Sequence, residues 1–189
     1  VDQDQFPVLK KEPPVPKGYV RVFEDNRYCD YEDGFGQFSD ASFQSTFDYR
    51  SVSGYCTFFG GAVVDWGSQT QAVVAQSTME AEILATFRGN SQMLHIRTLL
   101  QELGELSHFT PTIAFEDNVA AKIVLNSPGK KAKAGKHIER VIAKAQQWVR
   151  DRVIRYAYCR TDLMLADVFT KQLEYHKFVE FRKRLMNIR

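Results

Sequence analysis

Short runs rich in aromatic and β-branched residues open the part of the chain that follows residue 35. Gly36–Ser42, Gly54–Phe59 and Ala62–Trp66 have the composition and length of β-strands. A Gly-Gly pair separates the last two runs, which predicts a β-hairpin with a tight turn. Gln71–Ala75 is a candidate continuation of the same sheet.

A helical pattern follows, from Ser77 to about Glu102. The apolar residues that carry this pattern are Ile83, Phe87, Leu94, Leu99 and Leu103. Gly104 comes directly after the pattern and predicts its end, because glycine readily adopts the backbone conformation that terminates a helix.

Strands and helices alternate in the remainder of the chain. The predicted elements are a strand at Thr112–Glu116, helices at Asn118–Leu125 and His137–Arg150, a strand at Val153–Cys159, and a helix at Leu163–Lys171 that resumes at Tyr175. An antiparallel hairpin followed by β–α crossovers predicts an α/β fold, with a mixed sheet and helices on its faces.

Length and composition predict one folded domain with an extension. The chain has 189 residues, of which 44% are hydrophobic, enough to build a core and to exclude a fully disordered chain. Four of the six prolines lie in the first sixteen residues. We therefore expect residues 1–35 to be an N-terminal tail or linker and residues 36–189 to be the domain. No apolar run is long enough to span a bilayer, so we expect no membrane partner.

Cysteine usage predicts a location inside the cell. Three cysteines are widely separated and form no Cys-x-x-Cys pair, which argues against a disulfide framework or a zinc site. This pattern fits a reducing compartment, in the cytoplasm, the nucleus or an organelle.

Positive charge is concentrated in one segment, although the whole chain has a net charge of only +2. Residues 129–155 hold nine lysines and arginines against two acids, a local net charge of +7. Such a segment is either a phosphate-binding surface or a solvated basic face.

Four acidic residues occur where predicted elements can converge. Asp40 lies in the first strand, Glu82 one turn into the long helix, and Asp117 at a strand–helix junction. Asp167 lies in the helix that follows the last strand. Because gathered carboxylates repel one another, such a group needs a cation, and hard oxygen ligands favour Mg²⁺ or Mn²⁺. Two such ions about 4 Å apart can activate water for phosphodiester hydrolysis.

Each acid also has an ordinary structural interpretation. Asp117 is well placed to cap the following helix, Asp40 could be an exposed acid at a strand end, and Asp167 could be a solvated helix residue. On the long helix, Ser77-Thr78-Met79-Glu80 has the pattern of a capping box, which assigns Glu80 to the helix start. Glu82 is then the better candidate for a metal ligand.

Six blocks of sequence, taken together, are more specific than any single acid. In chain order, they are Phe38–Ser42; Arg50–Tyr55 with Phe58–Gly61; Trp66 with Gln71–Glu82; Glu116–Ala121; Lys136–Glu139; and Leu165–Lys171. In content, order and approximate spacing, these blocks resemble the RNase H domain of copia-type LTR retrotransposons. The resemblance covers roughly residues 36–173.

The resemblance implies an RNase H-like fold, with a five-stranded mixed sheet flanked by helices. It implies hydrolysis of the RNA strand of RNA–DNA hybrids with two Mg²⁺ ions, for which Mn²⁺ can substitute. Asp40, Glu82, Asp117 and Asp167 would be both the catalytic residues and the metal ligands. The residues expected to contact the hybrid are Lys130, Lys131, Lys133, Lys136, His137 and Arg140.

Two functions from different classes are compatible with this resemblance. The first is an active ribonuclease H, associated with a reverse transcriptase domain or descended from such a protein. The second is a domesticated copy that serves as a structural or binding subunit of a larger assembly without catalysis. The presence of all four acids favours the enzyme.

Overall fold

The computed structural model of the chain describes residues 19–22, 27–30, 34–129 and 135–187. Its strands are β1 (Tyr19–Val22), β2 (Arg27–Asp30), β3 (Phe35–Ser42), β4 (Val52–Phe59), β5 (Ala62–Thr70), β6 (Thr112–Glu116) and β7 (Ile154–Tyr158). Its α-helices are α1 (Thr78–Glu102), α2 (Val119–Leu125), α3 (Lys136–Arg150) and α4 (Tyr175–Leu185). Two 3₁₀-helices, η1 (Thr161–Leu163) and η2 (Leu165–Phe169), follow β7.

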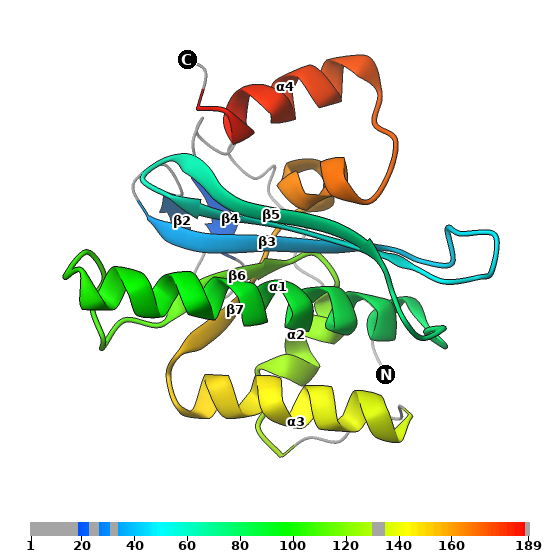
Figure 1. The fold of residues 1–189 in the computed structure, drawn as a ribbon, viewed down its shortest axis with the longest axis horizontal. Helices are drawn as coiled ribbons and strands as arrows, with labels where there is room; N and C mark the ends of the chain where they lie inside the picture. The colour runs from blue at the N-terminus through cyan, green and yellow to red at the C-terminus, as the bar shows by residue number, and fades with distance from the viewer. Residues whose placement is uncertain (1–18, 23–26, 31–33, 130–134, 188–189) are drawn as a thin grey trace, which may run out of the picture.

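Five of the strands form one mixed sheet in the order β5-β4-β3-β6-β7. β3, β4 and β5 are antiparallel neighbours, whereas β6 runs parallel to both β3 and β7. Figure 1 shows α1, α2 and α3 on one side of the sheet and η2 and α4 on the other. This arrangement confirms the predicted α/β class with a five-stranded mixed sheet.

Each face of the sheet carries its own apolar cluster. On the face covered by η2 and α4, Phe38 and Phe115 pack with Leu165 and Phe181. On the opposite face, Ile83 of α1 lies in a cluster with residues of α2, α3 and β7. The sheet is therefore held between two layers, as expected for an element whose two faces are both apolar.

The predicted hairpin between β4 and β5 is confirmed. Gly60 and Gly61 both have positive φ, at 58° and 80°. A two-residue turn of this kind matches the twist of the strands, and glycine adopts it without steric cost.

The last strand of this hairpin is longer than its apolar pattern. β5 continues to Thr70, which pairs with Val52 of β4, whereas the prediction that Gln71–Ala75 continues the sheet is wrong. The Gln71 side chain donates hydrogen bonds to Ser53 Oγ and to the Ala81 carbonyl. Ala75 is buried in a small cluster with Ala81 and Ala85 near the start of α1. Its apolar character therefore reflects packing against this helix rather than a place in the sheet.

The predicted α-helix at Leu163–Lys171 is also wrong, since two short 3₁₀-helices occupy this region. Met164, Leu165, Ala166 and Asp167 are four consecutive buried residues. An α-helix on a sheet surface buries one stripe and cannot bury four successive side chains equally well. The tighter 3₁₀ turn, with Asp167 N–H donating to the Met164 carbonyl, permits this burial.

The segment that precedes the sheet contains two strands that the sequence pattern did not predict. β1 and β2 pair antiparallel, with Tyr19 opposite Asp30. Whether residues 1–35 act as a tail or linker, with a domain boundary at residue 36, stays a prediction.

Among the described residues, no helix has the length and apolar character required to cross a bilayer.

A polar stripe fixes α1 along the sheet. Thr86 shares a hydrogen bond with Ser39 of β3, and Asn90 donates to the hydroxyl of Tyr156 in β7. Farther along the helix, Arg97 donates to Thr112 Oγ1. These buried bonds determine how far along the sheet the helix begins, and they therefore determine the position of Glu82.

The apolar pattern that predicted this helix is only partly its buried face. Ile83 is fully buried, but Leu99 and Leu103 are mostly exposed. Toward the C-terminal half of α1, the side of the helix that faces the sheet includes the polar residues Thr86, Asn90 and Arg97 where a regular amphipathic helix would have apolar ones.

A glycine in β4 allows η2 to approach the sheet closely. A Cβ atom on Gly54 would lie 2.6 Å from Thr170 Cγ2 and 2.8 Å from Phe169 Cβ. Gly54 is also the residue opposite Asp40 in the β3–β4 ladder. The absence of a side chain at this position therefore brings the η2 segment close to Asp40.

We expect Gly54→Ala to destabilise the protein by about 1–3 kcal/mol, because the added methyl group overpacks this contact. Urea unfolding of the two proteins measures the difference. Thr170→Ser keeps the hydroxyl and removes the nearer methyl group, so the double variant should lose less stability than the sum of the single variants. Strict additivity would show that the clash is not with Thr170.

Candidate metal centre

Asp40 and Asp117 lie at the carboxyl ends of neighbouring parallel strands. The pairing of β3 with β6 ends with Phe38 opposite Phe115, and each aspartate lies two residues beyond this pair. Since side chains alternate along a strand, both aspartates lie on the face that carries the two stacked phenylalanine rings. The register of the two strands therefore brings these acids together.

Glu82 reaches the same place from α1. Ser77 caps this helix by accepting a hydrogen bond from Glu80 N–H, and the Glu80 carboxylate accepts one from the N–H of Gln76. Glu80 is therefore engaged in hydrogen bonds at the start of the helix, as the capping pattern predicted. Glu82 lies two residues farther along and points in a different direction.

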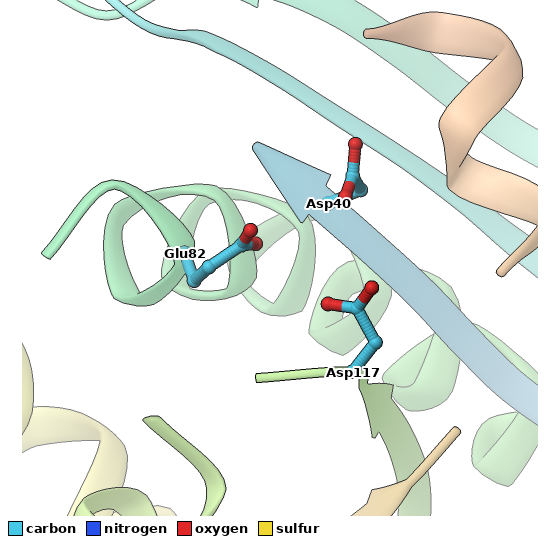
Figure 2. A group of neighbouring side chains, drawn as sticks. All are labelled: Asp40, Glu82 and Asp117. Atoms are coloured by element: carbon cyan, nitrogen blue, oxygen red, sulfur yellow. The ribbon is translucent and has the colours of Figure 1, made fainter. Parts of the chain in front are cut away.

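Three carboxyl groups converge at this end of the sheet. One oxygen from each of Asp40, Glu82 and Asp117 lies within 4.8 Å of the others. Figure 2 shows Glu82 and Asp117 pointing into the same space beside Asp40. Asp40 and Glu82 are buried, and Asp117 is half-buried.

Burial and repulsion from neighbouring carboxylates raise the pKa of all three groups. Burial is the largest cause for each of them. The pKa of Glu82 is raised further by its acidic neighbours Glu116, Asp40 and Asp117. One Glu82 carboxyl oxygen, Oε2, is buried without a hydrogen-bond partner among the described residues.

This donor set fits a hard divalent cation. Three carboxylates that disfavour their own charge would be stabilised as anions by a bound cation, and oxygen ligands are those that Mg²⁺ and Mn²⁺ prefer. The buried Glu82 Oε2 also lacks the hydrogen bond that a buried polar atom normally has.

Another buried acid, Glu116, lies next to this group, and its burial was not predicted from the sequence. Its side chain is fully buried on the opposite face of β6 from Asp117, and burial raises its pKa to about 8. It accepts hydrogen bonds from Thr86 Oγ1 and from the N–H of Asn118. Its sequence pattern, a strand-end glutamate directly before Asp117, does not distinguish a buried acid from an exposed one.

The ordinary interpretations of the single acids are wrong in this structure. The α2 helix is capped by Asn118, whose side chain accepts from Ala121 N–H, and Asp117 instead accepts a hydrogen bond from Thr161. Asp40 and Asp167 are 2% and 0% exposed, so neither is a solvated surface acid.

Asp167 lies near the other acids but is held by lysines. Its Oδ1 lies 2.8 Å from Lys171 Nζ, and its Oδ2 lies 2.9 Å from Lys177 Nζ. Lys171 Nζ is also 3.6 Å from Asp40 Oδ1, and Thr170 Oγ1 donates to Asp40 Oδ2. The role of Asp167 as a metal ligand stays a prediction, as do the catalytic roles of the other three acids.

Thr170, Lys171 and Lys177 were not predicted to belong to the site. Thr170 and Lys171 end the Leu165–Lys171 block, so their position beside Asp167 was visible in the sequence. Lys177 comes from α4, and nothing in its local pattern indicated a contact with Asp167.

The predicted nucleic-acid contacts are only partly covered by the structure. Lys130, Lys131 and Lys133 lie outside the described residues. Lys136, His137 and Arg140 are exposed in the first turns of α3. In Figure 1 this end of α3 lies at the same end of the molecule as the start of α1. Binding by these residues stays a prediction.

Plant retrotransposon polyproteins are similar to this chain over most of its length. The Pol polyprotein from transposon RE2 of Arabidopsis thaliana is 32% identical over 150 residues, which is 78% of this chain and 10% of the polyprotein. The Pol polyprotein from transposon TNT 1-94 of Nicotiana tabacum is 30% identical over 152 residues, which is 80% of this chain and 11% of that protein. The chain thus spans about a tenth of the length of these relatives. No family model matches it.

Solved structures of ribonucleases H have the same fold. The RNase H1 of Halobacterium salinarum superimposes with a TM-score of 0.52 at 14% identity, covering 72% of this chain and 93% of that one. An RNase H1 isolated from compost gives a TM-score of 0.55 at 13% identity, covering 73% of this chain and 93% of that one. By sequence, therefore, the chain is homologous to a segment of copia-type retrotransposon Pol polyproteins, and its fold is that of the ribonucleases H, as its motifs implied.

Proposed function

We propose that this chain is a ribonuclease H that hydrolyses the RNA strand of RNA–DNA hybrids. The observation that carries the proposal is the convergence of Asp40, Glu82 and Asp117, whose pKa values are all raised. These three residues would hold Mg²⁺, or Mn²⁺ in its place, and Asp167 would complete a site for a second ion. Bound divalent ions would supply a Lewis acid that lowers the pKa of water and stabilises the leaving alkoxide.

The residues around the acids prepare the site for this chemistry. Thr170 and Thr161 donate hydrogen bonds to Asp40 and Asp117, so both carboxylates are oriented before a cation binds. The Ser39–Thr86–Glu116 network lies on the α1 side and fixes α1 against β6 behind Glu82. Rigid elements on both faces of the sheet therefore support the ligands, as a preorganised site requires.

The proposed substrate follows from the family and from RNA chemistry. A 2′-hydroxyl distinguishes the RNA strand of a hybrid from DNA, whereas the duplex is held mainly through its phosphates and its shape. Exposed basic residues at the start of α3 would provide phosphate contacts. Since the relatives are polyproteins about seven to eight times as long as this chain, a reverse transcriptase domain is the proposed partner.

We expect Glu82→Gln to lower kcat for hybrid cleavage by about 100-fold or more, because losing several kcal/mol of charge stabilisation costs at least that factor. The matched control is Glu80→Gln, which changes the same residue type on the same helix and keeps an oxygen for the cap. A labelled RNA–DNA hybrid with Mg²⁺ measures both. Equal cleavage by both variants would contradict the assignment of Glu82. No cleavage by the folded native protein would favour a structural or binding subunit.

Without divalent ions, we expect the unfolding midpoint to fall as the pH rises from about 4.5 to about 8. The folded protein keeps Glu116 protonated up to about pH 8, whereas the unfolded chain releases this proton near 4.5. The folded state therefore binds more protons in this window, and it loses stability as the pH rises. Thermal unfolding measures the slope. Glu116→Gln should make the slope smaller without abolishing it, because the raised pKa values of Asp40, Glu82 and Asp117 contribute in the same direction. An unchanged slope in this variant would contradict the buried assignment.

The affinity of the chain for an RNA–DNA hybrid should fall as the salt concentration rises. The double variant Lys136→Ala/Arg140→Ala should reduce the slope of log affinity against log salt by about 2, which is about 1 for each lost phosphate contact. Fluorescence anisotropy with a labelled hybrid measures this slope. Arg150→Ala is the control, because Arg150 lies about 15 Å farther along the same helix than Arg140. An equal loss from the control would indicate a general charge effect rather than a contact at the start of α3.

A further inference from the structure

Two ammonium groups neutralise Asp167, and one of them also contacts the acidic cluster. Lys171 and Lys177 lie 2.8 Å and 2.9 Å from different carboxyl oxygens of Asp167. Only Lys171 extends to Asp40, at 3.6 Å from its Oδ1. The Lys171 Nζ atom therefore lies between Asp40 and Asp167, where it contributes one positive charge.

The surroundings of Lys171 keep this ammonium charged. Burial alone would lower its pKa, but the bond to Asp167 and the charges of Asp40 and Asp117 raise it above the usual value. Its Nζ atom lies 3.6 Å from an oxygen of Asp40, one of the three acids of the Asp40–Glu82–Asp117 group. It is thus a counter-charge that the chain itself provides.

Hydrogen bonds and ring stacking hold the backbone at Lys171 in place, whereas its side chain is partly exposed to solvent. Lys171 N–H and Thr170 N–H both donate to the Asp167 carbonyl. Just before them, the Phe169 carbonyl accepts from Ser68 Oγ, and the Phe169 ring stacks on Trp66. The Lys171 side chain is 38% exposed, so it can swing into solvent while its backbone stays in place.

The geometry points to Lys171 as an internal cation that takes the place of a second divalent ion between Asp40 and Asp167. This inference rests on the proposed function and concerns the same site. In the absence of substrate, the chain binds one divalent ion at Asp40, Glu82 and Asp117. A second ion binds only when the Lys171 ammonium moves aside, because the two positive charges repel each other at this distance.

Lys171 is a positioning residue in this scheme. It offsets the negative charge of the Asp40 and Asp167 carboxylates and keeps them in place until a cation replaces it. Asp167 remains paired with Lys177 when Lys171 leaves, so the buried carboxylate is not left without a counter-charge.

Mn²⁺ binding to the substrate-free chain tests the inference. Calorimetry counts the ions, and electron paramagnetic resonance detects spin coupling between two neighbouring Mn²⁺ ions. We expect one uncoupled ion in the native protein. We expect two coupled ions in Lys171→Met, the second binding at least about tenfold more tightly than any second ion in the native protein.

Two control variants separate position from net charge. Lys171→Arg keeps a cation at this place and should still bind one ion. Lys177→Met removes one charge from the same carboxylate without changing the contact to Asp40, and it should also bind one ion. Lys171→Gln provides a second neutral variant, and circular dichroism confirms that each variant is folded.

The outcomes distinguish the inference from the proposed function. One ion in both the native protein and Lys171→Met would overturn the inference and leave the metal site intact. Two coupled ions in the native protein would also overturn it. No ion in any variant would overturn the proposed metal-dependent function, and the inference with it.

Discussion

The repulsion among buried carboxylates is the constraint on which the rest of this site depends. Asp40, Glu82 and Asp117 gather at one end of the sheet, with Glu116 behind them and Asp167 beside them. In a poorly solvated place, such charges are costly unless a proton, a hydrogen bond or a cation offsets them. The protein uses all three, in the raised pKa values, the threonine hydroxyls and the lysine ammonium groups.

The scaffold explains why the acids stay together despite this cost. The β3–β6 register places two of them at the same level, and the hydrogen bonds of α1 to β3, β6 and β7 place the third. On the other face, Gly54 permits the close approach of η2, which brings Thr170 and Lys171 to Asp40. Stability of the surrounding layers therefore maintains an arrangement that is unfavourable by itself, as is common for functional sites.

Local patterns predicted most of the fold because the elements that they describe are locally consistent. The Gly-Gly turn, the capping box at Ser77 and the helices after Asp117 follow from short-range chemistry. The pattern failed where tertiary contacts override it. β5 extends through polar residues because β4 offers backbone partners, and η2 is a 3₁₀-helix because four successive residues are buried between the sheet and α4.

The amino-acid sequence alone predicted most of the element types, the resemblance to the retrotransposon domains and the candidate acids, because these depend on local spacing and on residues in fixed order. It could not determine which acids meet, because that depends on strand register and on side-chain direction across distant segments. Only the tertiary structure decided that Asp40, Glu82 and Asp117 form one group while two lysines hold Asp167. The physical reason is that charge interactions act through space, between residues that the sequence keeps far apart.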